Sequence, residues 1–293
     1  MPVFDTPVPI SVTVEIAVGE VRVIASDRAD TTVDVRPTDS TRRSDVRAAE
    51  QTRVEYVDGR LLVKAPRGGW RHFSPLGGRE SIDVEIGLPA GSQLRGGAAV
   101  AKLECTGRLG ECNFKTSAGD LRVAEAGPVD LKSAVGDVIV ERASGHALIA
   151  TSSGAVRVGR VEGTAVVKNS NGGTRIGAIT GDLRISSANG RIEVDEAGAA
   201  VVAKTANGDI RLNDVAQGSV VAQTARGKVE IGIHDGVTAW LDLDTSFGKV
   251  RTELDAAERP ESGADALKVS ARTAFGDITI RRSPARDAQT NDV

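Results

Sequence analysis

Four aspartates that follow regularly spaced glycines are the most obvious candidates for chemistry: Asp120, Asp137, Asp209 and Asp277. Stacked carboxylates can act as acid/base pairs or bind calcium, and some β-helix enzymes use them on saccharides. Other residue types interrupt the series, however, and only Asp120 and Asp137 belong to adjacent repeats. Aspartate is also common in turns, because its carboxylate accepts hydrogen bonds from nearby backbone N–H groups. We therefore favour a turn role over a polysaccharide-acting site.

The cysteines and histidines are few and are not spaced as metal ligands. Cys105 and Cys112 occupy positions that we expect to point inward, and His72, His146 and His234 fall in different parts of the chain. A redox pair is the alternative for the cysteines, but two small core side chains are the simpler interpretation. The sequence contains no Ser-His-Asp pattern and no phosphate-binding loop. We therefore predict no catalytic, metal-binding or cofactor-binding residues and no enzymatic activity.

A repeat positions all of these residues, and its clearest copy is VVAKTANGDIRL at 201–212. Its two arms alternate apolar and polar side chains, which is the period of a strand with one buried face. The arms flank Asn207-Gly208, a pair that tolerates positive φ in a tight turn. This stretch predicts two short strands joined at a glycine.

The turn glycine recurs at intervals of about 18 residues, as expected of a repeat protein. It stands at Gly119, Gly136, Gly154, Gly172, Gly190, Gly208, Gly227, Gly248 and Gly276. A second glycine often follows about nine residues later, so each unit contains two strands and two turns. We expect Gly190, next to Asn189, to adopt positive φ, so that valine at this position should destabilise the protein more than asparagine.

Like residues occupy the same place in successive units, which distinguishes stacked coils from an antiparallel meander. Val167, Ile185 and Ala203 all stand five residues before their turn glycine, and Thr, Ser or Asn fills the position three residues before it. Stacking brings each strand into parallel pairing with its own copy in the next coil. We therefore predict an all-β parallel β-solenoid, right-handed because strand crossovers favour that hand, with the meander as the alternative.

The repeat divides the chain into three regions. Residues 1–93 contain less regular strand and hairpin signals and are predicted to cap one end of the same solenoid. Residues 94–282 carry the repeats, and the final unit with the insertion at 255–265 is expected to cap the other end. Residues 283–293 are polar and are predicted to form a disordered tail.

The repeated phrase S/T-A/S-x-G-D-[VIL]-x-[VIL] resembles the bacterial adhesin-type β-solenoid family of unknown function. The phrase stands at 116–123, 133–140, 205–212 and 273–280, and the Leu-Pro-Ala-Gly lead-in at 82–91 is also similar. The resemblance covers most of the chain. It implies a parallel β-helix and supplies no catalytic residues.

Composition and charge limit the classes of function. The net charge of −3 argues against a dedicated nucleic-acid binder, and the low aromatic content of 3% predicts a core of small and β-branched side chains. The first 18 residues lack a basic segment followed by an apolar one, and no apolar run approaches the roughly 20 residues that span a bilayer. A cytoplasmic location is the default expectation.

Two outward columns are the candidate binding surfaces. One is apolar and includes Val166, Val202 and Val221, with Arg184 between them. The other is basic and includes Arg157, Arg175 and Arg211. Outward arginines are well solvated and can form ion pairs with neighbouring strands, so they need no partner. An uncovered apolar column, in contrast, often marks an interaction site. Coverage of the apolar column by the N-terminal strands or a loop is the alternative.

These observations favour a cytoplasmic, non-enzymatic binding or assembly scaffold that binds a protein partner or a second copy of itself. An adhesin exported to the cell surface is the second hypothesis, and a β-helix enzyme acting on polysaccharide is the third. The sequence identifies no ligand.

Overall fold

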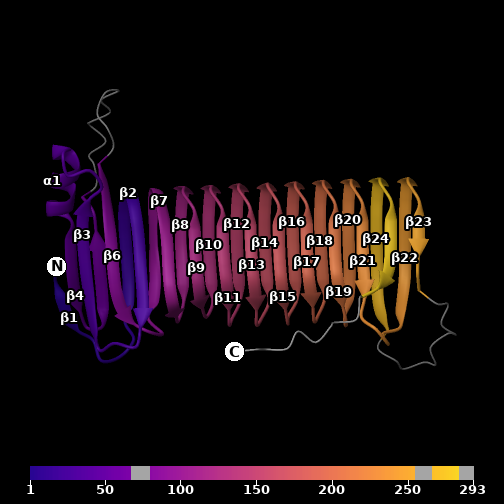
Figure 1. Cartoon of the computed structure of the whole chain (residues 1–293), viewed down its shortest axis with the longest axis horizontal. Coiled ribbons are helices and arrows are strands. Elements are labelled where there is room, and N and C mark those ends of the chain that lie inside the picture. The colour runs from indigo at the N-terminus through magenta and orange to yellow at the C-terminus, as the bar shows by residue number, and fades with distance from the viewer. Residues whose placement is uncertain (67–79, 255–265, 284–293) are drawn as a thin grey trace, which may run out of the picture. The chain divides into compact units, whose positions relative to one another are not determined.

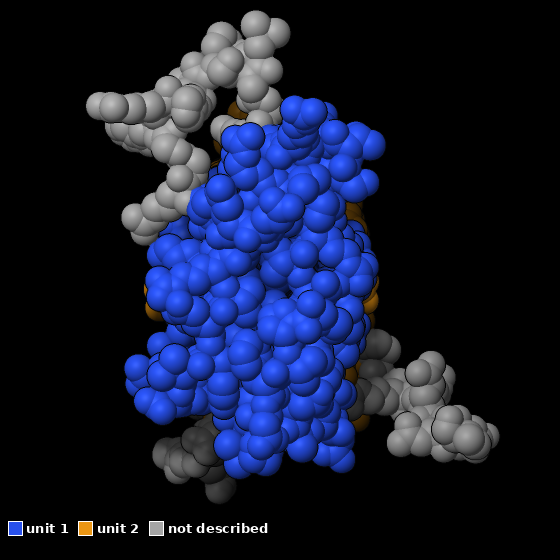
Figure 2. Space-filling view, turned by 90° about the vertical axis from the view of Figure 1, so that its left-hand side faces the viewer, with its two compact units in different colours: residues 1–161 blue, residues 162–293 orange. Residues whose placement is uncertain are grey.

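A computed structural model describes residues 1–66, 80–254 and 266–283. The chain divides into two compact units, residues 1–161 (unit 1) and 162–293 (unit 2), which are coloured separately in Figure 2. Both consist of short strands in parallel coils, as Figure 1 shows. The predicted all-β parallel β-solenoid is therefore confirmed.

Unit 1 contains one helix and thirteen strands among its described residues. The helix is α1 (Arg43–Gln51). The strands are β1 (Val3–Asp5), β2 (Ser11–Ser26), β3 (Asp30–Pro37), β4 (Arg53–Val57), β5 (Arg60–Lys64), β6 (Ser81–Pro89), β7 (Gln93–Leu109), β8 (Cys112–Ala118), β9 (Leu121–Ala126), β10 (Val129–Val135), β11 (Val138–Ala143), β12 (Ala147–Ser153) and β13 (Val156–Val161).

The N-terminal strands of unit 1 combine parallel coil pairing with antiparallel pairing. Strand β2 pairs in parallel with β5, β6 and β7, so the N-terminal region joins directly onto the first coil. Antiparallel pairs β1–β3, β3–β6 and β4–β5 lie beside it, and α1 contacts β3 and β6. Figure 2 looks onto this end of unit 1, where residues of the unit form a closely packed surface. Asp58 and Gly59, both with positive φ, form the turn of the β4–β5 hairpin, one of the hairpins that the sequence indicated in residues 1–93.

The remaining strands of unit 1 form two walls of regular coils. One wall stacks the first part of β7, then β8, β10 and β12, and the other stacks the second part of β7, then β9, β11 and β13. The Thr and Ser residues that stand three positions before the turn glycines of unit 1 are buried inside the coils. Thr151 and Ser133 donate hydrogen bonds to the carbonyl oxygens of Gly136 and Gly119 in the preceding coils, at 3.1 and 3.2 Å.

Unit 2 continues the same pattern with twelve described strands. They are β14 (Ala165–Asn171), β15 (Thr174–Ile179), β16 (Leu183–Asn189), β17 (Ile192–Ala197), β18 (Val201–Asn207), β19 (Ile210–Val215), β20 (Ser219–Arg226), β21 (Val229–Ile233), β22 (Ala239–Phe247), β23 (Val250–Thr252), β24 (Leu267–Phe275) and β25 (Ile278–Arg282). Val167, Ile185 and Ala203 are direct partners in β14, β16 and β18 and are fully buried. This confirms the inward column that the repeat predicted.

The turn glycines allow coils to approach more closely than any side chain would permit. Gly190 has φ +148°, and a Cβ added there would lie 2.1 Å from the carbonyl oxygen of Gly172 in the preceding coil. Its own N–H donates to the carbonyl of Asn207 in the following coil at 2.8 Å. Asn171, Asn189 and Asn207 form a side-chain ladder along this turn, with hydrogen bonds of 2.8 and 2.9 Å.

The last coil in the sequence is not the last coil in the stack. Strand β24 pairs with β20 on one side and with β22 on the other, and β25 lies in the same way between β21 and β23. Figure 1 shows β24 in yellow between β20 and β22. The expectation that the final unit caps the end is therefore wrong, because the chain first builds the coil at 239–252 and then returns inside it. The insertion at 255–265, the loop containing His72 and the tail from residue 284 lie outside the described residues.

Candidate functional site

The predicted apolar column lies on the outer face of unit 2 and is only half covered. Val166 pairs with Arg184, Arg184 with Val202, and Val202 with Val221, so the four residues follow one another across β14, β16, β18 and β20. All three valines are half-buried. The N-terminal strands pair within unit 1, with β5, β6 and β7, and take no part in the pairing of this column.

The column continues into a groove on β20, β24 and β22. Val221 has Ser270 of β24 as its register partner, and Ser270 in turn has Asp242 of β22. Trp240 of β22 also lines the groove, together with Val221. Its side chain is largely in solvent, with 73% of the residue surface exposed. The groove has a volume of about 320 Å³. Its lining is more apolar than that of the hollow at the β4–β5 hairpin or of the one beside Arg22 and Asp83, so it is our candidate for an interaction site.

Trp240 was not identified from the sequence, although a signal was present. It occupies the outward column that Lys268 fills in the adjacent coil and Ser219 fills in the coil after that. A large aromatic residue in a column of polar residues gains nothing from the core, since the column points away from it. This contrast makes Trp240 a candidate contact residue, because exposed tryptophan is strongly enriched at binding hot spots.

The arginine column is a solvated face held by ion pairs. Arg211 lies 2.7 Å from Glu230, and Arg157 lies 3.5 Å from Asp137. Arg175 lies 3.1 Å from Asp195, and this hydrogen bond raises the pKa of the Arg175 guanidinium above its ordinary value. Each such surface pair contributes at most about 1 kcal/mol. These contacts explain the column without a ligand.

The turn aspartates accept backbone hydrogen bonds from the next coil. Oδ1 of Asp120 accepts from the N–H of Asp137 at 2.9 Å, and Oδ1 of Asp137 accepts from the N–H of Ala155 at 2.7 Å. Asp209 and Asp277 accept in the same way from Lys228 and Lys249, both at 2.9 Å. The geometry therefore supports the turn role, since each carboxylate satisfies a backbone donor at a coil corner.

The cysteines lie together in the interior of unit 1. Cys105 on β7 and Cys112 on β8 are both free and buried. A side-chain hydrogen bond with Cys112, together with burial, raises the pKa of the Cys105 thiol well above its ordinary value. A raised pKa removes the thiolate that redox chemistry requires. Among the described residues, no group of three or more His, Cys, Asp or Glu side chains is arranged to hold a metal ion.

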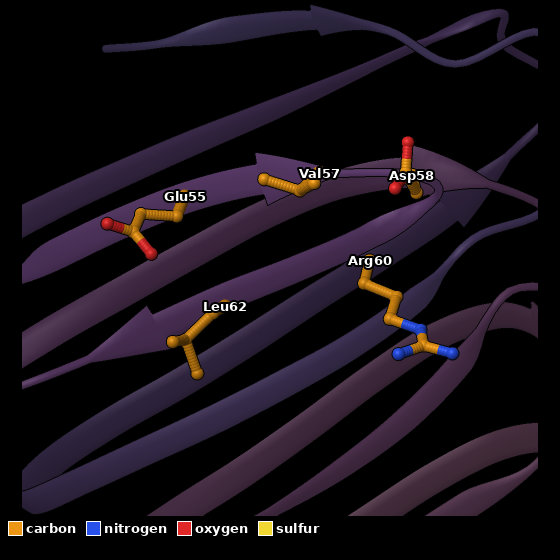
Figure 3. Close-up of a pocket in the computed structure, with 5 residues that line it drawn as sticks. All are labelled: Glu55, Val57, Asp58, Arg60 and Leu62. Atoms are coloured by element: carbon orange, nitrogen blue, oxygen red, sulfur yellow. The ribbon is translucent and has the colours of Figure 1, made fainter.

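A second hollow lies on the outer face of the β4–β5 hairpin in unit 1. Figure 3 shows Glu55 and Val57 on one strand and Arg60 and Leu62 on the other, with Asp58 at the turn. The carboxylate of Glu55 and the guanidinium of Arg60 lie at opposite ends of the hollow in this view and do not converge on one point. Glu55 instead forms an ion pair with Arg53 of the same strand. Nothing in this arrangement selects a ligand.

The described residues define a parallel β-solenoid protein with turn-capping carboxylates and an apolar groove on its outer face. None of their helices is long and apolar enough to cross a membrane. The chain belongs to the Toastrack DUF4097 family, whose model matches residues 9–281. Among curated proteins, none matches the sequence significantly.

Several solved structures resemble the chain over nearly its whole length. A candidate adhesin from Bacteroides fragilis NCTC 9343 is 12% identical with a TM-score of 0.38, and the match covers 95% of this chain and 96% of that one. A candidate cell adhesion protein from Clostridium sporogenes ATCC 15579 is 10% identical with a TM-score of 0.22, covering 96% and 98%. A candidate lipid binding protein from Parabacteroides distasonis ATCC 8503 is 11% identical with a TM-score of 0.29, covering 97% and 96%. At these values the likenesses do not indicate what this chain binds.

Proposed function

We propose that this chain is a non-enzymatic binding scaffold that captures a protein partner on the outer face of unit 2. The observation that carries the proposal is the apolar groove beside Val221 and Trp240. An exposed tryptophan next to half-buried valines supplies a large apolar contact area, which is the usual core of a protein interface. The partner inserts an apolar side chain beside Trp240, and Val202 and Val166 extend the contact along the column.

The charges around the groove support a protein partner. Lys268 and Asp242 line the groove together with Trp240, so the apolar centre is bordered by one cation and one anion. An apolar centre with a polar border is the common anatomy of a protein–protein interface. The turn carboxylates have a role in hydrogen bonding between coils, which supports a scaffold over a polysaccharide-acting enzyme.

The test is capture of partners from an extract of the native cells by the full chain and by two double variants. Val202→Asp with Val221→Asp places two charges in the column, where we expect the captured partner to be lost. Ala206→Asp with Ala225→Asp is the matched control, because these exposed alanines lie on the same two strands and the added charge is equal. Melting curves establish that both variants are folded.

The two double variants separate the outcomes. A partner that is lost with the valine variant and retained with the alanine variant supports the proposal. Retention of every captured protein by the folded valine variant overturns it. The Trp240→Ala variant provides a second measurement, since removal of one exposed aromatic side chain should weaken capture without affecting the core.

We also propose a cytoplasmic location, and an exported adhesin is the alternative. The proposal is supported by Cys105 and Cys112, which are free thiols, since free thiols are usual in a reducing compartment. Cell fractionation with antibodies against the chain is the test. Recovery in the surface fraction would favour the adhesin.

A further inference from the structure

The coil at 239–252 is the terminal coil of unit 2, and its outer edge has no partner strand among the described residues. Strand β22 pairs with β24 alone, and β23 pairs with β25 alone. Figure 1 shows these two strands beyond β24. The backbone N–H and C=O groups on the other edge of this coil, as far as residues 1–66, 80–254 and 266–283 are concerned, can pair with a further strand.

The inward columns of unit 2 are buried in each neighbouring coil and become exposed in this one. Val269 and Ala271 of β24 are buried, but their partners Leu241 and Leu243 on β22 are half-exposed. In the other wall Ile278 is fully buried, and its partner Val250 exposes 45% of its surface. The terminal coil thus presents core residues that no further coil covers within the described part of unit 2.

The sequence of β22 lacks several of the features that usually protect an edge strand, and its only charged residues are Asp242 and Asp244. Its nine residues, AWLDLDTSF, include no proline and no lysine, and its pairing with β24 has no register shift. Phe247 at its end is 68% exposed and stacks on Phe275, with ring centroids 5.0 Å apart. A regular edge of this length can pair with a strand that brings positive charges opposite its two aspartates.

We propose that this terminal coil is a homodimer interface, in which two copies of the chain join end to end through β22 and β23. In this unit, each coil is covered by another coil that has similar side chains at matching positions. A second copy of the chain can supply such a coil. A closed two-fold contact uses the same surface of both copies and therefore removes both edges.

Charge selects between the two possible two-fold arrangements. A coil of two strands and two turns runs its strands in opposite directions, so both arrangements are antiparallel. In one, β22 faces β22 of the other copy, which opposes Asp242 and Asp244 to their own equivalents. In the other, β22 of each copy faces β23 of the other, which brings Asp244 towards Lys249 and Arg251. Like charges on facing strands are destabilising and unlike charges stabilise, so the second arrangement is preferred.

Three exposed charges of the terminal coil have no oppositely charged partner among the described residues of a single copy of the chain. Asp244, Lys249 and Arg251 are exposed and form no ion pair within the described part of the chain. Asp244 lies on one wall of the coil and the two cations lie on the other wall or at its turn, so they do not meet in one copy. The second arrangement provides each of them with an oppositely charged neighbour.

The size of the terminal coil indicates a reversible dimer. Nine strand residues extend about 30 Å, and two walls with their outward side chains are about 20 Å wide. Each copy would therefore bury roughly 600 Å², which is near the lower limit for a specific interface. We expect a dissociation constant in the micromolar range, rising with salt because the contact includes ion pairs.

The test is sedimentation velocity of the full chain over a concentration series, with charge-reversal variants. Asp244→Lys alone and Arg251→Asp alone should each weaken dimerisation by about ten-fold or more, and the combined variant should restore most of the affinity. Lys204→Asp on β18 is the control, since this exposed charge lies away from the terminal coil and should leave dimerisation unchanged. Circular dichroism establishes that each variant is folded.

Each outcome decides the proposal. Restoration by the combined variant supports the β22–β23 arrangement. Stronger dimerisation of the Asp244→Lys variant, with no effect of Arg251→Asp, overturns it in favour of β22 facing β22. A monomer at all concentrations, or a dimer that no reversal affects, overturns the interface altogether. The valine variants that test partner capture do not change these charges, so the two proposals can fail separately.

Discussion

Replacement of Gly190 tests why the coils of this solenoid require glycine at their corners. Two separate costs are expected for Gly190→Ala. The backbone has φ +148°, a conformation that residues with a Cβ rarely adopt. The added Cβ would also lie 2.1 Å from the carbonyl oxygen of Gly172 and 2.7 Å from its carbonyl carbon. Both atoms belong to backbone, so neither can rotate away.

The magnitude follows from these two costs. Backbone strain of this kind is worth about 1–3 kcal/mol. Relief of the close contact requires the coils to separate locally by about 1 Å, and overpacking of this kind costs another 1–3 kcal/mol. The displacement also strains the hydrogen bond from the N–H of Gly190 to Asn207. We expect a total of about 2–6 kcal/mol for alanine, and at least as much for valine.

Two other glycines of unit 2 separate the strain from the close contact. Gly236 has φ +76° and no atom within 4 Å of an added Cβ, so Gly236→Ala should cost only the strain, about 1–2 kcal/mol. Gly173 lacks positive φ, and its nearest contact is 3.9 Å away, so Gly173→Ala should change stability by less than about 0.5 kcal/mol. The measurement is the urea midpoint of each variant, followed by circular dichroism.

The order of the three midpoints decides the argument. The close-contact explanation requires Gly190→Ala to unfold at the lowest urea concentration, Gly236→Ala at an intermediate one, and Gly173→Ala near the wild type. Equal midpoints for the Gly190 and Gly236 variants would show that the close approach of the coils has no cost. The structure also changes the expectation for Gly190→Asn. Asparagine tolerates φ near +57°, not +148°, and its Cβ meets the same oxygen, so it should be about as harmful as alanine.

Three further predictions concern the core, the turn ladder and the thiols. Ile185→Ala should lower the free energy of unfolding by about 2–5 kcal/mol, because Ile185 is fully buried. Leu241→Ala on the half-exposed terminal coil should lower it clearly less. Urea midpoints compare the two variants, and equal losses would contradict the difference in burial. Asn189→Ala removes two ladder hydrogen bonds, of 2.8 and 2.9 Å. In the same assay it should lower the free energy of unfolding by about 1 kcal/mol. An unchanged midpoint would show that the ladder does not stabilise the protein. Cys105 and Cys112 should not react with a disulfide reagent at pH 8 until the chain is unfolded in guanidinium, because burial and the raised pKa of Cys105 suppress the thiolate; rapid labelling of the folded protein would contradict this.

Much of the fold could be predicted because every repeat unit has the same pattern of alternating apolar residues and turn glycines. Alternation determined which side chains point inward, and identical positions in successive units determined that Val167, Ile185 and Ala203 share one column. The turn glycines and the inward threonines were predicted for the same reason. Each of these features depends on contacts between a residue and its own copy about 18 positions away, so a regular period is enough to identify the neighbours.

Only the tertiary structure decided the features that break the period. Coils with nearly identical columns can stack in any order, because Val269 fits against Val220 as well as against Leu241. The insertion of β24 between β20 and β22 is therefore not visible in the sequence. That order places Lys268 and Ser270 of β24 between Val221 and Trp240 in the groove, and it leaves β22 in the terminal coil. The candidate groove and the proposed dimer interface both depend on it, since local patterns specify what each coil contains and long-range packing specifies which coil lies next to it.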